Sequence, residues 1–424
     1  MNLHVKSMFR RLCRLGVAVA VAATFVALFS LPIYGVTLRL WNFNVNAEVR
    51  DWYQSVFKPA FEAEYPDVTL DLLFPSQYTY YDQLLVAIAS GVAPDVCTSN
   101  NALFYTEGLV IDLNDLVASW PVAQEMFPPV LNMLSHQGHL YGIPLAIAPR
   151  TMVVNTRILA EGGYDPQNPP YTWDDIARAI PRLNRWNAER TVLEQVGMHV
   201  ELLDIGAVHG FIYTNGGEIM NPDGTAAFNS AEGVEALDFW TQLYAQHLPS
   251  HISKPTFVQG KAAMVAYNNP SVFINIARTN MDLLNDIAVA PQPVTNKRSA
   301  VLLMGAPIGI TTASKHKDLA WELLKFHFRP DMSSQYNELF GQIPPIRTAL
   351  SSGIMRSAPW IGAYLNLTEK FGVPSWAFQS TVFQLVRGYL ADAAAAAYKG
   401  TMPAKQALDE AARLWNQVLG EQTQ

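Results

Sequence analysis

Strand-like and helix-like segments alternate along the chain from Val36 onward, and this alternation limits the fold more than any other feature. Apolar and polar residues take turns over residues 36–41, which is the period-two pattern of a strand. The segments that follow read as a helix, a strand, a helix and a short strand, at residues 48–65, 68–74, 81–90 and 95–97. This β-α-β-α-β order predicts an α/β fold in which helices flank a mostly parallel sheet.

The same pattern restarts after Arg150. A strand pattern covers residues 152–155, and a helix signal follows at Thr172, which has Asp175 three residues later in close likeness to a capping box. A similar signal stands at Asn229. No Ser/Gly-rich or charged linker separates the two units. We therefore expect two lobes joined by short crossovers, with the chain passing between them more than once.

The first 35 residues have the order of a signal peptide. Four basic residues precede an uncharged, mostly apolar run that extends from Leu15 to Leu38. The run is also long enough to span a bilayer, for which about 20 residues suffice, so an uncleaved membrane anchor stays open. In both cases the rest of the chain is expected outside the cytoplasm, because basic residues stay inside. Removal of residues 1–35 would take away four positive charges and change the formal charge from −7 to −11.

The two cysteines exclude several kinds of site. Cys13 precedes the apolar run and so differs from the lipid-modified cysteine that follows such a run, while Cys97 is alone in the rest of the chain. A disulfide and a thiolate metal site both need more than one cysteine. Charged residues make up 15% of the chain and form no block of like charge, so we expect no nucleic-acid partner.

Motifs that carry catalysis are missing from the sequence, which has no G-x-S-x-G, no H-E-x-x-H and no glycine-rich phosphate loop. The histidine pairs at 136 and 139 and at 247 and 251 have Gly or Pro between them, which favours surface or loop positions. Asp174 and its neighbour Asp175 stand at a predicted helix start, where carboxylates offset the helix dipole. We therefore expect no catalytic residue, no metal site and no cofactor.

A series of short motifs, each weak alone, occurs in one order along nearly all of the chain after residue 35. The motifs include Leu40-Trp41-Asn42-Phe43, Phe61–Pro66, Tyr81–Leu84, Ala89–Val96, Tyr141–Pro144, Tyr171–Asp175, Asn215–Gly217, Gly260–Met264 and Ile343–Arg347. In this order they resemble the family of ABC-transporter extracellular solute-binding proteins that includes the maltose- and glycerol-phosphate-binding proteins. The chain departs from the family pattern in lacking a lipobox cysteine. It also carries Asn268 and Asn269 where the family often has an aromatic residue or Ser.

The resemblance implies a type II periplasmic-binding-protein-like fold, in which two α/β lobes, each a mostly parallel sheet flanked by helices, surround a hinge. The implied division is a signal peptide or anchor at 1–35, an N-terminal lobe from 36–147 and 281–343, and a C-terminal lobe from 148–280 and 344–424. The resemblance also implies an exported, monomeric component of an ABC importer that captures a sugar between the lobes and delivers it to the permease. A secreted glycosidase and a membrane-tethered scaffold are the rival interpretations.

Ligand contacts are expected at the gap between the lobes, because open α/β sheets bind ligands beyond the carboxyl ends of their strands. Aromatic rings pack against sugar faces, and planar polar groups hold hydroxyls. The expected contact residues are Trp41, Asn42, Tyr78, Asp95, Asn100, Asn101, Arg150, Asn215, Tyr267, Asn268, Asn269, Gly305 and Arg347. Trp41 could equally belong to the core, and Asp95 could equally cap a turn. Arg150 and Arg347 in one cleft would also suit a phosphate or carboxylate, so a phosphorylated polyol such as glycerol phosphate is the alternative solute.

Overall fold

The computed structural model describes residues 35–43, 45–199, 205–247, 256–295, 297–351 and 353–422. The predicted signal peptide or anchor therefore lies outside the described residues, apart from Gly35. In the part of the chain that is described, no helix combines the length and the apolar character needed to cross a membrane.

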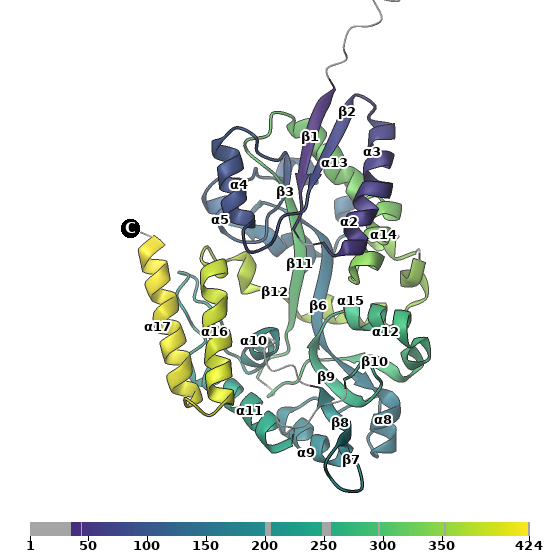
Figure 1. The fold of residues 1–424 in the computed structure, drawn as a ribbon, viewed down its shortest axis with the longest axis vertical. Helices are drawn as coiled ribbons and strands as arrows, with labels where there is room; N and C mark the ends of the chain where they lie inside the picture. The colour runs from purple at the N-terminus through teal and green to yellow at the C-terminus, as the bar shows by residue number, and fades with distance from the viewer. Residues whose placement is uncertain are drawn as a thin grey trace, which may run out of the picture.

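The chain folds into two lobes, placed one above the other in Figure 1. Each lobe has its own large cluster of buried apolar side chains among the described residues. The cluster of the N-terminal lobe draws on residues from Leu38 to Ala349. The cluster of the C-terminal lobe begins at Phe127, beside the hinge, and runs to Trp415. The two-lobe α/β fold expected from the sequence is confirmed.

Three parallel strands form the sheet of the N-terminal lobe. β1 (Val36–Trp41) pairs with β2 (Val68–Leu73) on one side and with β3 (Val96–Thr98) on the other. The helices of this lobe are α2 (Ala47–Trp52), α3 (Lys58–Glu64), α4 (Tyr80–Ala89), α5 (Leu103–Thr106), α6 (Asn114–Ala118), α13 (Lys317–His327) and α14 (Pro330–Phe340). α2 continues into α3 through the π-helical segment Tyr53–Phe57, so the helix predicted over 48–65 is present.

Two long strands, β6 (Ile143–Asn155) and β11 (Val301–Ile310), run antiparallel and side by side from one lobe into the other (Figure 1). At one end β11 pairs antiparallel with β3. At the other end β6 pairs antiparallel with β9 (Ala262–Asn268) and β10 (Ile287–Ala290). The described strands thereby form one ten-stranded sheet that spans both lobes. Its pairing is mixed rather than mostly parallel, because the chain crosses between the lobes on strands of opposite direction.

The C-terminal lobe extends this sheet with β8 (Leu193–His199), which is parallel to β9, and with β7 (Arg185–Trp186) at the edge. Its helices are α8 (Thr156–Glu161), α9 (Trp173–Leu183), α10 (Ile205–Thr214), α11 (Ala231–His247), α12 (Ser271–Thr279), α15 (Pro359–Phe371), α16 (Phe383–Tyr398) and α17 (Ala404–Gln422). Smaller elements near the hinge are α7 (Pro128–Leu131), the pair β4 (Ser135–His136) and β5 (His139–Leu140), and β12 (Gly372–Pro374) beside β11. Because β10 pairs with the C-terminal end of β6, it lies with this lobe rather than with the N-terminal lobe, to which the sequence-based division assigned it.

The N-cap residues predicted for two helices can be compared with those in the structure. At α9, Thr172 Oγ1 accepts a hydrogen bond from the backbone N–H of Asp175 at 3.1 Å, as predicted. At α11, Ser230 takes the place expected for Asn229, and its Oγ accepts from the backbone N–H of Gly233 at 3.2 Å. The Asn229 side chain instead donates to Asp409 Oδ1 at 2.9 Å, so it ties the start of α11 to α17.

Candidate functional site

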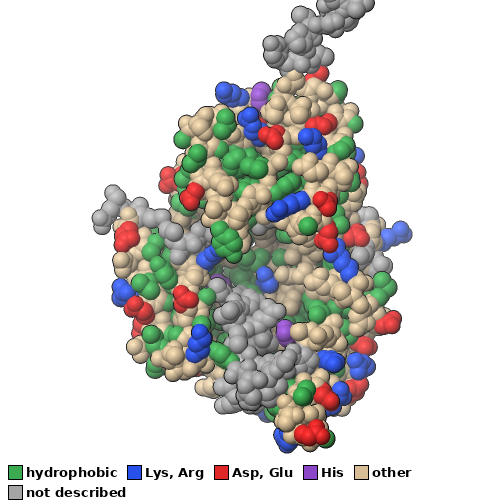
Figure 2. Space-filling view, in the orientation of Figure 1, with side chains coloured by type: hydrophobic (Ala, Val, Ile, Leu, Met, Phe, Trp, Pro, Cys, Tyr) green, Lys and Arg blue, Asp and Glu red, His purple; other side chains and the backbone are tan. Residues whose placement is uncertain are grey.

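The strand directions bring the carboxyl ends of strands from both lobes to the gap between the lobes. β3 and β6 both run antiparallel to β11, so β3 and its parallel neighbour β1 point toward the C-terminal lobe. β9 runs antiparallel to β6 and parallel to β8, so these two strands point back toward the N-terminal lobe. Figure 2 shows the surface hollowed between the lobes. Ligands of open α/β sheets bind at such strand ends, which makes this gap the candidate site.

A pocket of about 300 Å³ lies where β8 and β9 end. Its lining residues are Arg150, His199, Thr256, Phe257, Val258, Asn268, Asn269, Ser271, Val272 and Asn275. Three of the residues predicted to bind ligand, Arg150, Asn268 and Asn269, therefore come together in one place. Among the described residues that line the pocket there is no Asp or Glu.

Arg150 stands on β6, where this strand passes from one lobe to the other. Its Nη1 donates to the Tyr267 carbonyl oxygen at 3.5 Å, and its Cζ lies 5.7 Å from the centroid of the Tyr267 ring. Tyr267 is only 2% exposed, and its ring lies so close to Gly210 that an added Cβ there would be 2.1 Å from the ring. Tyr267 therefore supports Arg150 from the core, and its ring does not offer the stacking face that the sequence suggested.

Asn268 ends β9, and Asn269 leads from this strand toward α12. Asn268 Oδ1 accepts from the backbone N–H of Asn269 at 2.9 Å, and Asn269 Oδ1 accepts from the backbone N–H of Ser271 at 2.9 Å. The main chain thus fixes the orientation of both side-chain amides, because only the amide oxygen can accept a hydrogen bond from a backbone N–H. Within the described residues neither side-chain NH₂ group has a partner, so both remain available as donors.

The N-terminal lobe contributes the residues that follow β1 and β3. Trp41 and Asn100 are partly exposed at these two strand ends. Asn101, in contrast, is buried, and its Oδ1 accepts from the backbone N–H of Leu103 at 3.0 Å, at the start of α5. Trp41 and Asn100 therefore lie at strand ends that point toward the gap, whereas Asn101 holds the turn into a helix.

Asn42 belongs to a buried polar network inside the N-terminal lobe. The residue is 1% exposed, its Nδ2 donates to Tyr53 Oη at 3.2 Å, and its Oδ1 accepts from Thr98 Oγ1 at 3.0 Å. Tyr53 Oη in turn shares a hydrogen bond with His327 Nε2 at 2.8 Å. Asn42 thus links the carboxyl ends of β1 and β3 to the helices behind them, rather than facing the gap.

Asp95 and Asn215 lie away from the gap. Asp95 precedes β3, at the amino end of the strand, where its carboxylate accepts from the backbone N–H of Arg39 at 2.8 Å and from Ser314 Oγ at 2.6 Å. Asn215 is fully buried after α10 and donates to Glu235 Oε2 at 2.9 Å. Both residues therefore make their contacts within their own lobe rather than toward the gap.

Gly305 and Arg347 also contact protein. A Cβ at Gly305 would lie 2.8 Å from Met133 Sδ and 2.9 Å from the Ala146 carbonyl oxygen, so the close approach that favours glycine here is to the protein itself. Arg347 is exposed, and its Cζ lies 3.9 Å from the centroid of the Phe127 ring. It does not line the pocket that contains Arg150, so that pocket does not unite the two guanidinium groups predicted for one cleft.

Cys97 offers no reactive group in this region. The side chain is fully buried at the end of the N-terminal sheet, and burial raises the pKa of its thiol to about 12. A thiol with such a pKa stays protonated at neutral pH and is neither a nucleophile nor a metal ligand. Within the described residues no group of three or more His, Cys, Asp or Glu side chains is placed to hold a metal ion.

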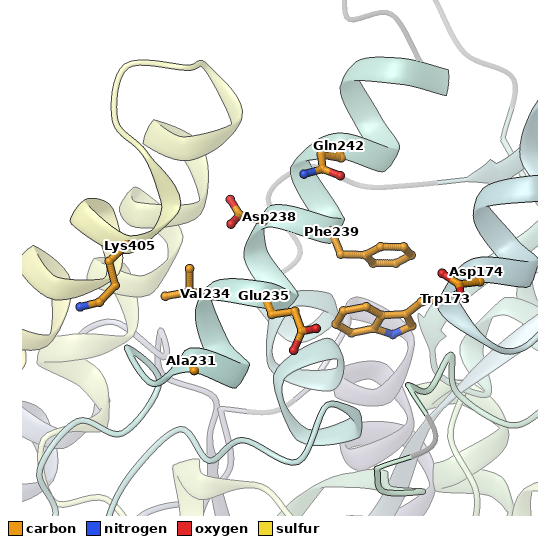
Figure 3. A pocket seen from close by; sticks show the side chains of 9 residues that line it. All are labelled: Trp173, Asp174, Ala231, Val234, Glu235, Asp238, Phe239, Gln242 and Lys405. Carbon is orange, nitrogen blue, oxygen red and sulfur yellow. The ribbon is translucent and has the colours of Figure 1, made fainter.

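A second hollow, of about 700 Å³, opens on the helical side of the C-terminal lobe (Figure 3). Trp173 of α9 and Phe239 of α11 stack there with ring centroids 4.3 Å apart, and Glu235 and Asp238 lie nearby. Glu235 is already paired with Lys297 at 2.9 Å. Because α9, α11 and α17 form this hollow, away from the strand ends, it is not part of the candidate site.

Comparison with known proteins identifies the fold and its family. Residues 46–332 match the family model described as bacterial extracellular solute-binding protein. The chain belongs to this family. The resemblance drawn from the motifs is thereby confirmed, and so is the expectation of a binding protein rather than an enzyme.

Relatives of this solute-binding protein have similar sequences and folds. A protein of Brucella abortus (strain 2308), described as a binding protein, is 24% identical over 318 residues, which are 70% of this chain and 74% of the relative. The arabinooligosaccharide-binding protein of Halalkalibacterium halodurans is 25% identical over 285 residues, 62% of this chain and 61% of that protein. Among solved structures, the sugar-binding protein MalE of Xanthomonas citri has a TM-score of 0.76 at 19% identity, covering 92% of this chain and 98% of its own. An ABC-transporter solute-binding protein of Thermotoga lettingae, bound with α-D-tagatose, has a TM-score of 0.72 at 22% identity, with coverages of 91% and 100%.

The two lobes of this solute-binding protein also contact each other away from β6 and β11, the two strands that connect them. Tyr78, next to α4 in the N-terminal lobe, is 73% exposed, and the Cζ of Arg387 from α16 lies 5.2 Å from the centroid of its ring. Glu48 of α2 forms an ion pair of 3.6 Å with Arg278 of α12. Tyr78 was predicted to contact the ligand rather than the other lobe, and neither arginine was predicted, because neither stands in a pattern that signals a partner in the other lobe.

Breaking the Glu48–Arg278 pair should shift the lobes toward a more open arrangement by a small amount. Both side chains are more than one-third exposed, and such pairs contribute about 0–1 kcal/mol, which is at most about a fivefold change in population. We expect Arg278→Gln to increase the radius of gyration in small-angle scattering slightly, and Glu48→Gln to give no further increase in the double variant. Arg157→Gln, which breaks an ion pair within the C-terminal lobe, is the control. Additive effects of the two substitutions would contradict a direct interaction.

Proposed function

We propose that this protein captures a sugar in the gap between its lobes and delivers it to the membrane permease of an ABC importer. The observation that carries the proposal is the meeting of strand carboxyl ends from both lobes at one gap, with Trp41 on one side and the Arg150 pocket on the other. Aromatic rings and planar polar groups are the two kinds of contact that sugars need. Related proteins support the ligand class, because one is an arabinooligosaccharide-binding protein and two solved structures of similar fold hold α-D-tagatose and mannotriose.

Within this proposal, ligand contacts fall to the predicted residues that reach the gap. Trp41 packs against a sugar face, while Asn100, Arg150, Asn268 and Asn269 hold polar groups of the solute. A ligand that bridges both lobes favours the closed arrangement, because it binds that arrangement more tightly than the open one. Asn42, Asn101, Asp95 and Asn215 would act indirectly, by holding the walls in place.

We also propose that the protein is exported and that it functions as a monomer. The family is extracellular, which supports a location outside the cytoplasm. Residues 1–35 would then serve as a cleaved signal peptide or as an anchor, and sequencing the N-terminus of the secreted protein distinguishes the two. Docking on the permease would follow closure, since only the closed protein presents both lobes in a fixed relation.

A thermal-shift screen of sugars, combined with small-angle scattering, tests the proposed function. A true ligand raises the free energy of unfolding by RT ln(1 + [L]/Kd), about 2.7 kcal/mol at 100 times Kd, and should make the protein more compact. A screen of mono- and oligosaccharides without any shift in melting temperature, or turnover of an oligosaccharide during incubation, would overturn the proposal. The second outcome would favour a glycosidase, which needs two carboxylates about 5–10 Å apart across its cleft.

Trp41→Ala should weaken binding of the best sugar in that screen by about tenfold or more, because one aromatic stacking face is lost. The side chain is only partly buried, so the variant should still fold. Titration calorimetry measures the affinity, and urea unfolding checks the fold. Trp186→Ala, at a partly buried tryptophan of the edge strand β7, is the matched control. Unchanged affinity in a folded Trp41→Ala protein would remove Trp41 from the site.

A further inference from the structure

The pocket at the ends of β8 and β9 combines a positive charge with two amide groups whose NH₂ donors are held in a fixed orientation. Asn268 and Asn269 have their amide oxygens occupied by backbone N–H groups, which leaves their NH₂ groups as donors. Arg150 adds a guanidinium, which has donors and no acceptor. Asn275 is exposed at the edge of the pocket, and its amide is free to take either orientation.

Arg150 has no acidic partner among the residues that the structure describes. Its contacts in the described structure are the Tyr267 carbonyl oxygen and the Tyr267 ring, and its Nε is buried with no hydrogen-bond partner. A half-buried guanidinium is normally paired, because removal of a charge from water is costly. The formal charge of the whole chain is −7, so an unpaired cation in a pocket without Asp or Glu among its described lining residues is a local exception.

The positive charge distinguishes this pocket from a site for a neutral sugar, since the hydroxyl groups of Thr256 and Ser271 also line it and can accept hydrogen bonds from a sugar. A carboxylate or phosphate oxygen only accepts, and a guanidinium binds such a group with two parallel hydrogen bonds. α12 also begins at the pocket, and the positive end of its dipole favours a negative charge there.

We propose that the solute of this protein is an acidic sugar, whose carboxylate or phosphate group binds at Arg150, Asn268 and Asn269. The inference rests on the proposed function and names the ligand class of the same site. The anionic group lies against the C-terminal lobe, and the sugar ring extends toward Trp41 in the N-terminal lobe. A uronic acid and a sugar phosphate share this chemistry, and the experiment separates them.

Titration calorimetry with four probes tests the inference: D-galacturonate, D-galactose 6-phosphate, D-galactose and inorganic phosphate. We expect one of the two acidic sugars to bind at least tenfold more tightly than D-galactose and than inorganic phosphate. Arg150→Gln should weaken that binding about 10- to 100-fold, since hydrogen bonds to a charged group are lost, and Arg150→Lys should restore part of it. Arg185→Gln, at an exposed arginine of the edge strand β7, changes the charge equally and should leave the affinity unchanged.

Asn268→Asp is the second variant, and it keeps the shape of the side chain while placing a negative charge in the pocket. It should abolish binding of the acidic sugar and leave the urea unfolding midpoint near that of the parent protein. Equal affinity for D-galactose and for both acidic sugars would overturn the inference and leave the proposed function standing. Failure of all four probes would overturn the inference, while the thermal-shift screen decides separately whether other sugars bind. Binding of an acidic sugar that Arg150→Gln and Asn268→Asp do not weaken would place the anion elsewhere and refute the assignment.

Discussion

Lowering the pH from 7 to 4 should reduce the free energy of unfolding by about 5–7 kcal/mol, because two histidines are buried in neutral form. Burial lowers the pKa of His327 to about 3 and that of His209 to about 3. The unfolded chain keeps the ordinary pKa of about 6.5 for both. Between pH 6.5 and 3 the unfolded state therefore binds more protons, and each histidine costs about 1.4 kcal/mol per pH unit as the pH falls.

The surroundings of the two histidines explain why they stay neutral. His327 Nε2 shares a hydrogen bond of 2.8 Å with Tyr53 Oη, inside a cluster of rings that includes Trp52 and Tyr336. His209 Nδ1 accepts from Trp376 Nε1 at 3.2 Å, and its Nε2 is buried without a partner among the described residues. Among the described residues, no carboxylate acts on either ring to favour the charged form.

Urea unfolding at pH 7, 5.5 and 4 measures the effect. The stability conferred by both histidines should be complete above pH 6.5 and should decline steadily below it. His327→Gln removes one titrating group and should halve the histidine part of the decline, whereas His136→Gln, at an exposed position, is the control. A free energy of unfolding that stays constant down to pH 4 would show that the histidines are not buried as described.

Truncation of Trp415 should have the second largest effect, a loss of about 3–5 kcal/mol in the free energy of unfolding, as for other fully buried large side chains. Trp415 is 0% exposed on α17, and its Nε1 donates to the Gly224 carbonyl oxygen at 2.9 Å. Its ring lies 5.6 Å from that of Phe228 and 5.0 Å from that of Trp376, measured between centroids. One side chain thus joins the C-terminal helix to two other segments of the lobe.

Urea unfolding of three variants distinguishes the contribution of packing to stability from that of the hydrogen bond to Gly224. The variants are Trp415→Ala, Trp415→Phe and Arg413→Ala. Trp415→Phe should lose roughly 1–2 kcal/mol, because most of the packing remains but the Gly224 carbonyl loses its donor. Arg413→Ala, on the exposed face of the same helix, should change the stability by less than about 0.5 kcal/mol. If Trp415→Ala unfolds at the same urea concentration as Arg413→Ala, the helix does not depend on this contact.

Local signals predicted those parts of the fold that depend on neighbouring residues. The strand over 36–41 and the cap at Thr172 are present because the pattern and its physical cause lie within a few residues. β6 was predicted only over 152–155, because its first half contains Pro144 and Pro149 and is buried on both faces, so apolar and polar residues do not alternate there. Its pairing with β11, more than 150 residues away, has no local signal.

The candidate site was predicted less completely, for a physical reason. Asn and Asp side chains suit a ligand and a buried hydrogen-bond network equally well, so residue type did not separate Asn268, which lines the pocket, from Asn42 and Asp95, which are bonded within the lobe. The decision depends on which end of a strand a residue occupies and on how strands from different parts of the chain align. His199 lines the pocket but was not predicted, since the strand that carries it was not assigned.

The two strands shared by both lobes have a consequence for biosynthesis. The core of the N-terminal lobe needs β11, and its pairing joins Ile310 to Val96, so this lobe cannot be completed while the chain is shorter than about 310 residues. The core of the C-terminal lobe needs Trp415, close to the end of the chain. Contacts between residues so distant in sequence form slowly. Neither core can therefore be completed until most of the chain has been made, and an incompletely folded polypeptide is the form that can be threaded through a narrow secretion channel.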